Sequence, residues 1–217
     1  MSSSKDRRLA ILISGRGSNM NSIIDACNSN FLEANVCLVI SNNPDSQGLL
    51  IAKEAGLDTK CIDHRDYESR ELFDKALLTA LHLAEAEFIL LAGFMRILTP
   101  TIINSFLGRL VNIHPSLLPK YPGLNTHQRA IDAGDKEAGA TVHYVTQELD
   151  SGPTIVQARV PIIATDTADT LASKVLEKEH QIYPFGIQLL IEHRITLENN
   201  KATMDGNILP VTGIRHA

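Results

Sequence analysis

Two polar residues end an otherwise apolar stretch, Leu110-Val111-Asn112-Ile113-His114, just before a proline-rich loop. In a strand, residues 112 and 114 point to the same face, about 7 Å apart. An amide and an imidazolium are both hydrogen-bond donors, and a developing oxyanion needs such donors. Buried polar side chains cost stability unless they are satisfied. Two interpretations therefore stay open: oxyanion stabilisation, or hydrogen bonds from Asn112 and His114 to the loop backbone.

A second candidate is the turn Gly15-Arg16-Gly17-Ser18-Asn19, between an apolar run and a helical pattern. Backbone N–H groups at a helix N-terminus bind anions, and glycines let a phosphate approach closely. The dinucleotide fingerprint requires a third glycine where this chain has Met20, and no P-loop lysine follows. The turn therefore suits the terminal phosphate of a small metabolite. The alternative is an ordinary strand-to-helix turn with Ser18 as its cap.

Asp150 lies in Leu149-Asp150-Ser151-Gly152-Pro153, a composition typical of a turn. Nothing in the sequence alone places this carboxylate beside His114. The remaining histidines, such as His143, form no ligand spacing of the H-E-x-x-H kind, so no metal site is predicted. The three cysteines form no C-x-x-C pair and are expected to be reduced thiols of a cytoplasmic protein.

The elements that must position these residues alternate between strands and helices. Apolar runs predict buried strands at 9–13, 36–40, 88–92 and 110–114, with a short strand at 60–63. Helices are predicted after residue 18, around 49–52 with an end at Gly56, over 68–84, and from Thr99 as N-cap. This alternation is typical of a doubly wound α/β fold, a mostly parallel sheet with helices on both faces.

After His114 the pattern becomes a more irregular mixture of β and α segments. Two β-rich stretches are predicted at 140–146 and 154–162. A long helix follows, from about Thr167 to His193, which Pro184 should kink or split. A hairpin around Asp205-Gly206 is predicted within 195–210. We expect one domain over residues 1–217, made of a nucleotide-fold-like half (1–114) and a second half (115–217).

Length and charge restrict the class of protein. A chain of 217 residues can bury a proper core without disulfides or metals. The net charge of −5 argues against a nucleic-acid carrier. No apolar stretch approaches the roughly 18 residues of a membrane span, and no signal peptide is visible. We therefore expect a cytoplasmic protein with no nucleic-acid or membrane partner. We further expect a monomer or weak homodimer, although neither charge nor length determines the oligomeric state.

Three stretches together resemble the phosphoribosylglycinamide formyltransferase family, the folate-dependent formyltransferases of purine biosynthesis. They are Ile13–Asn19, Leu91–Leu98 and Asn112–Gly123. The Asn-x-His-Pro-Ser-Leu-Leu-Pro element is shared across the formyltransferase superfamily, whereas the Gly-Ser-Asn turn and the Lys-Tyr-Pro-Gly continuation narrow the resemblance to this family. The likeness runs from about Leu9 to about Pro210. It implies transfer of a formyl group from 10-formyltetrahydrofolate, a co-substrate, to the amine of phosphoribosylglycinamide, without a metal.

The resemblance also implies roles for particular residues. Asn112, His114 and Asp150 match the catalytic trio, in which Asn112 and His114 stabilise the oxyanion and Asp150 assists proton transfer. The matched substrate contacts are Gly17, Ser18, Asn19, which hold the phosphate, and Glu179. The matched folate contacts are Arg70, Met95, Arg96, Ile97, Leu98, Asn112, Thr146, Gln147, Glu148, Leu149 and Asp150. Residues 115–217 thereby become the folate-side half.

Other functions compete with this interpretation. A formyltetrahydrofolate deformylase shares the Asn-His-Asp elements, but it normally adds an N-terminal regulatory domain and does not need the phosphate turn. A methionyl-tRNA formyltransferase would add a nucleic-acid-binding domain and a basic surface. A non-catalytic sugar-phosphate-binding α/β protein would use only the turn at Gly17, and it leaves Asn112, His114 and Asp150 unexplained.

Overall fold

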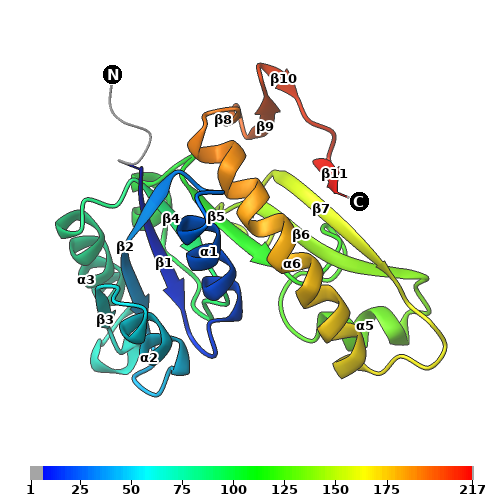
Figure 1. Cartoon of the computed structure of the whole chain (residues 1–217), viewed down its shortest axis with the longest axis horizontal. Helices are drawn as coiled ribbons and strands as arrows, with labels where there is room; N and C mark the ends of the chain where they lie inside the picture. The colour runs from blue at the N-terminus through cyan, green and yellow to red at the C-terminus, as the bar shows by residue number, and fades with distance from the viewer. Residues whose placement is uncertain (1–6, 217) are drawn as a thin grey trace. The chain divides into compact units, whose positions relative to one another are not determined.

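The computed structural model describes residues 7–216 (Figure 1). The chain divides into two compact units. Unit 1 runs to Val111, and unit 2 begins at Asn112. Strand β5 (Leu110–His114) begins in unit 1 and ends in unit 2. Residues 1–6 and 217 lie outside the described residues. The prediction that residues 1–217 form one domain stays a prediction.

Unit 1 is built on parallel strands around β1 (Arg7–Ile13). Strand β4 (Phe88–Leu91) pairs with one side of β1 and β2 (Ala34–Ser41) with the other, while β3 (Thr59–Cys61) pairs with β2. Leu9 to Ile13 have no exposed surface. A central parallel strand is covered on both faces, which explains why its sequence is an unbroken apolar run. The predicted strands of this half are confirmed.

The helices of unit 1 connect these strands. They are α1 (Ser18–Asn28), α2 (Gln47–Glu54), the 3-10 turn η2 (His64–Asp66), α3 (Arg70–Leu83) and α4 (Pro100–Ser105). Gly56 adopts φ +77° just beyond α2, which confirms it as the end of that helix. Thr99 is the N-cap residue of α4, as predicted, but its side chain makes no cap bond. Its backbone N–H donates to Asp74 Oδ2 at 2.5 Å instead.

Unit 2 contains an antiparallel pair, β6 (Glu137–Tyr144) and β7 (Thr154–Pro161), with β11 (Ile214–His216) parallel to β7. Helix α6 (Ala168–Ile191) packs along both β6 and β7 (Figure 1). A Cβ atom at Gly186 would lie 3.1 Å from Val142 Cγ1. The glycine therefore lets the helix approach the strand closely.

Of the two outcomes predicted at Pro184, a split does not occur, because α6 continues through it as one element, and a kink stays a prediction. Pro184 lies on a buried face, next to Tyr183. Proline removes one backbone hydrogen bond, and helices in proteins are stabilised mainly by packing of their apolar face. Here the packing outweighs the missing bond. The helix begins with a capping box between Thr167 and Thr170, close to the predicted start.

The rest of unit 2 has one short helix and a small sheet. Helix α5 (Thr126–Asp132) follows β5 and was not predicted, nor was β11. Strands β8 (Ile195–Glu198), β9 (Lys201–Met204) and β10 (Asn207–Ile208) form an antiparallel sheet. Its second turn lies at Asp205-Gly206, which confirms the predicted hairpin.

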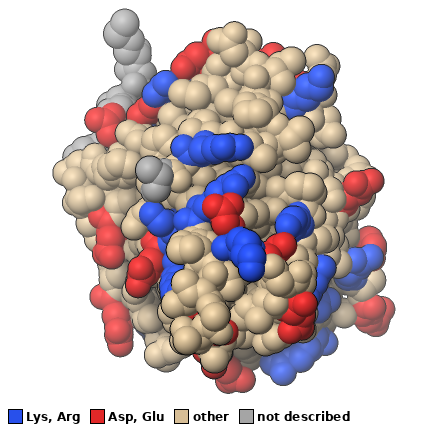
Figure 2. Space-filling model, turned by 90° about the vertical axis from the view of Figure 1, so that its right-hand side faces the viewer, with Lys and Arg blue, Asp and Glu red and all other residues tan. Residues whose placement is uncertain are grey.

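The predicted fold class is confirmed: the chain is an α/β protein with a mostly parallel sheet and helices on both faces. On the face drawn in Figure 2, Lys and Arg side chains lie among Asp and Glu side chains. Across residues 7–216, the structure contains no helix with both the length and the apolar character needed to cross a membrane.

Candidate active site

His114 is the last residue of β5, and the structure places Asp150 beside it. The Nδ1 atom of His114 lies 3.4 Å from Asp150 Oδ2, and both side chains are largely buried. The Nε2 atom lies 2.9 Å from the carbonyl oxygen of Tyr121. A carbonyl only accepts, so Nε2 carries a proton and Nδ1 is the ring atom that can exchange a proton with Asp150. A neutral His114 therefore holds its proton on the side away from the carboxylate.

Asp150 belongs to the connection between β6 and β7, and it is indeed a turn residue. It adopts φ +50°, and its Oδ2 accepts a hydrogen bond from Gly123 N–H at 2.8 Å. A Cβ atom at Gly152 would lie 1.8 Å from the carbonyl oxygen of Tyr144, so only glycine fits there. This close approach holds the end of the connection against β6. The turn geometry and the contact with His114 thus occur at the same residue.

Asn112 contacts a second histidine, His143, which lies on β6. The amide Nδ2 of Asn112 is 3.2 Å from His143 Nε2, and His143 Nδ1 is 2.8 Å from the carbonyl oxygen of Tyr144. Burial lowers the pKa of His143 to about 4, so the ring is neutral at pH 7. Its single proton sits on Nδ1, which donates to Tyr144, and Nε2 accepts from Asn112. One N–H of the Asn112 amide is thereby used, and the other is left to meet a ligand.

His143 was missed by the sequence interpretation, which considered it only as a metal ligand. Its Nε2 also lies 3.8 Å from Asp150 Oδ1, so it contacts two members of the predicted trio. The signal available in the sequence was the same one that drew attention to Asn112. A polar residue in an apolar strand needs a partner, and His143 stands within the apolar run of β6.

The predicted phosphate turn lies in unit 1, at the start of α1. Gly17 is the N-cap residue and adopts φ +78°. The alternative with Ser18 as the cap is wrong, because Ser18 is the first helical residue and no side chain caps this helix. The turn is fixed from α2: Gly15 C=O accepts from Ser46 Oγ at 2.8 Å and from Gly48 N–H at 3.0 Å.

The predicted folate contacts divide between the two units. In unit 1, Met95 and Ile97 are 66% and 51% exposed, whereas Leu98 is buried and Arg96 half-buried. Arg70, the first residue of α3, is exposed in the same unit. Residues 146–150 belong to unit 2. The buried Glu179 of α6, predicted as a contact of the ribonucleotide substrate, lies in the same unit.

Within residues 7–216, no group of three or more His, Cys, Asp or Glu side chains is arranged to hold a metal ion. The three cysteines are free thiols. The polar cluster of Asn112, His114, His143 and Asp150 can supply hydrogen bonds, a carboxylate and an imidazole. Donors beside a proton-accepting carboxylate are what a group transfer through an oxyanion requires.

A comparison with known families identifies the class. Residues 7–187 match the model of the family described as formyl transferase. The chain belongs to the formyl transferase family, as its three sequence motifs predicted.

Two similar relatives carry a more particular name. The chain is 45% identical to a phosphoribosylglycinamide formyltransferase of Escherichia coli, over 94% of this chain and 97% of that protein. It is 46% identical to a trifunctional purine biosynthetic protein of Drosophila melanogaster, over 88% of this chain but only 14% of that longer protein. A solved phosphoribosylglycinamide formyltransferase of Coxiella burnetii, in complex with CHES, superimposes with a TM-score of 0.93 at 41% identity and covers 97% of this chain and 99% of that one.

Proposed function

We propose that this chain transfers a formyl group from 10-formyltetrahydrofolate to the amine of 5-phosphoribosylglycinamide in purine biosynthesis. The observation that carries the proposal is the cluster of Asn112, His114 and Asp150, with the carboxylate 3.4 Å from the imidazole. The similarity to whole phosphoribosylglycinamide formyltransferases supports the choice of substrates.

Attack of the substrate amine on the formyl carbon places a negative charge on the formyl oxygen. Asn112 donates its remaining N–H to that oxyanion, because His143 already holds the other one. His114 is the second donor in its imidazolium form, because only then does Nδ1 also carry a hydrogen. Both of its ring nitrogens have partners, and the 3.4 Å contact with Asp150 is longer than a normal hydrogen bond, so it is the contact that substrate can replace.

Asp150 then moves the proton. The attacking amine must lose a proton and the folate nitrogen that leaves must gain one. A carboxylate can accept the first and return it to the second, with the charge of the imidazolium beside it as compensation. Direct attack of the amine needs no metal and no covalent enzyme intermediate.

The two substrates are assigned to separate groups of residues. Gly17, Ser18 and Asn19 hold the phosphate of the ribonucleotide through the N-terminus of α1. Glu179 contacts the same substrate. The folate contacts are Arg70, Met95, Arg96, Ile97, Leu98, Asn112 and residues 146–150. We further propose that the protein works in the cytoplasm as a monomer or weak homodimer, with small molecules as its only substrates.

One incubation series tests the proposal. The purified chain is mixed with 10-formyltetrahydrofolate, with and without the ribonucleotide. Loss of the 10-formyl group is followed by absorbance, and the formylated ribonucleotide by mass spectrometry. We expect turnover only with both substrates. Loss of the formyl group without the ribonucleotide would indicate the deformylase, and no turnover with binding of the ribonucleotide alone would indicate a non-catalytic binding protein.

A further inference from the structure

Ser14, just beyond β1, holds the segment that follows β4. Its backbone N–H donates to the carbonyl oxygen of Gly93 at 3.1 Å, and its hydroxyl accepts from Met95 N–H at 2.7 Å. The Met95 side chain is 66% exposed, so burial does little to fix it. The position of Met95 therefore depends on its backbone bond to Ser14.

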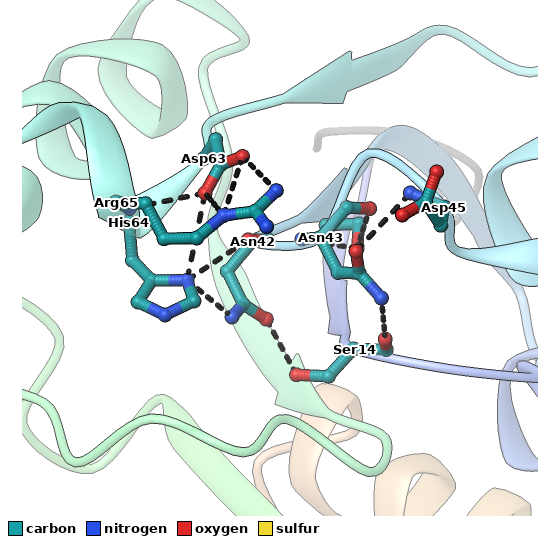
Figure 3. Close-up of polar contacts among 8 residues, drawn as sticks. Ser14, Asn42, Asn43, Asp45, Asp63, His64 and Arg65 are labelled. Carbon is teal, nitrogen blue, oxygen red and sulfur yellow. Dashed lines mark hydrogen bonds and ion pairs between the residues drawn. The ribbon is translucent and has the colours of Figure 1, made fainter.

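The Ser14 hydroxyl donates its own hydrogen bond to the side chain of Asn42. Ser14 Oγ lies 2.5 Å from Oδ1 of Asn42, a residue that is 4% exposed beside the end of β2. Because Oδ1 faces Ser14, the Asn42 Nδ2 faces the other way and lies 3.1 Å from His64 Nδ1 (Figure 3). The same Nδ1 atom also lies 3.1 Å from the backbone carbonyl oxygen of Asn42, so His64 contacts both the side chain and the backbone of that residue.

These contacts form a relay: Met95 N–H donates to Ser14, the Ser14 hydroxyl donates to Asn42, and Asn42 contacts His64. Successive hydrogen bonds of this kind polarise and strengthen one another. The relay joins residues beside the carboxyl ends of β1 and β2 to η2 and to the segment after β4. Ligands of open α/β sheets bind at such carboxyl ends.

The far end of the relay is anchored. The His64 ring packs edge-on against Phe73, with 6.5 Å between the ring centroids. Asp63 accepts from the backbone N–H and the guanidinium of Arg65, so its charge is mainly compensated there rather than by His64 (Figure 3). His64 is thus held by packing in an orientation that presents Nδ1 to Asn42.

We propose that Ser14, Asn42 and His64 are positioning residues that set the backbone at Met95 and, through it, the affinity for the folate co-substrate. The proposal rests on the proposed function, which assigns Met95 and the residues after it to folate. None of the three is predicted from the sequence as a site residue. Their contribution acts on folate binding and leaves the ribonucleotide site unchanged.

Amide hydrogen exchange tests the relay without any turnover. Ser14→Ala removes the acceptor of Met95 N–H, and we expect that amide to exchange about 2- to 10-fold faster, the effect of one hydrogen bond. His64→Leu removes the polar contact at the far end of the relay and should accelerate the same amide less. The matched variants are Ser14→Thr, which keeps a hydroxyl, and His64→Asn, whose amide offers either a donor or an acceptor near the place of Nδ1. Both should restore slow exchange, and equal exchange rates in Ser14→Ala and the wild type would overturn the relay.

Binding and kinetics test its purpose. In Ser14→Ala and His64→Leu, the Kd for tetrahydrofolate should rise about 2- to 10-fold, while the KM for the ribonucleotide stays within about twofold. Ser105→Ala also deletes a serine hydroxyl with one hydrogen bond, to Thr101 C=O, and should change neither constant. Faster exchange at Met95 with an unchanged Kd would overturn the positioning role.

The two proposals fail in different ways. A wild-type chain that does not bind tetrahydrofolate refutes the proposed function and the role in folate affinity, whereas the exchange rates still decide whether the relay exists. Should His64→Leu fail to fold, Ser14→Ala carries the same test at the other end of the relay. An equal rise in the ribonucleotide KM would mean a general structural role, and it would overturn the proposal.

Discussion

Acid should destabilise this chain through one buried side chain, His143. It is 2% exposed, and burial lowers its pKa from the ordinary value of 6.5 to about 4. Below about pH 6.5 the unfolded chain binds a proton at this ring, whereas the folded chain does not until about pH 4. The unfolded state therefore binds more protons in this window, so the free energy of unfolding falls as the pH falls.

The size of the effect follows from the shift. One pKa unit corresponds to about 1.4 kcal/mol, and between pH 7 and pH 4.5 the His143 contribution amounts to about 2 kcal/mol. His143→Gln cannot titrate. It loses the Nδ1 bond to Tyr144, so we expect it to be less stable than the wild type at pH 7. The difference in stability should then narrow by about 2 kcal/mol by pH 4.5.

Urea unfolding followed by circular dichroism at pH 7, 5.5 and 4.5 measures this difference. The other acid-titrating groups are common to both proteins and cancel, apart from Asp150, whose Oδ1 lies 3.8 Å from the ring. Ser105→Ala leaves His143 and its hydrogen-bond partners in place and should keep the pH dependence of the wild type. A difference between His143→Gln and the wild type that stays constant with pH would refute the reasoning from burial.

Three further predictions concern the proposed reaction. Asn112→Ala removes one oxyanion donor and should lower kcat by roughly 10²–10³ while tetrahydrofolate and ribonucleotide still bind; a near-normal kcat in a steady-state assay would make Asn112 structural. Asp150→Asn keeps a residue type that tolerates φ +50°, yet it should lower kcat at least about 100-fold, with Kd values by calorimetry within a few-fold; retained turnover would reduce Asp150 to a turn residue. Gly17→Val puts a branched side chain at φ +78°, where even a Cβ lies 3.0 Å from Gly48 Cα, and should raise the ribonucleotide KM strongly with little change for folate; an unchanged KM contradicts the phosphate assignment.

The strands of unit 1 were predictable because strands that are buried on both faces consist almost entirely of apolar residues. A strand covered on both faces is apolar at every position, so Leu9 to Ile13 can be recognised without knowing its neighbours. The helix α5 was missed for the opposite reason. It is a short segment of polar composition with only Thr126 and Ala130 buried, so it carries little periodic signal.

The site was predictable only in part. Asn112 and His114 stand out because they interrupt an apolar strand. Asp150 does not stand out, because its local sequence is that of a turn and only the fold brings it beside His114 from 36 positions away, 150 minus 114. The contact of Asn112 with His143 crosses between two strands, and the relay from Ser14 to His64 depends on three loops. Contacts of this kind are set by tertiary structure and leave no pattern in a linear sequence.

The close approach of Gly152 to Tyr144 determines where the connection that carries Asp150 can change in length. On the Gly152 side there is no room for even a methyl group, so an insertion there would push Asp150 away from His114. On the other side, Gln147, Glu148 and Leu149 are exposed. Insertions and substitutions should therefore be tolerated at residues 147–149. A library of peptides inserted there would change the surface that meets a ligand, while the Asp150 carboxylate stays beside His114.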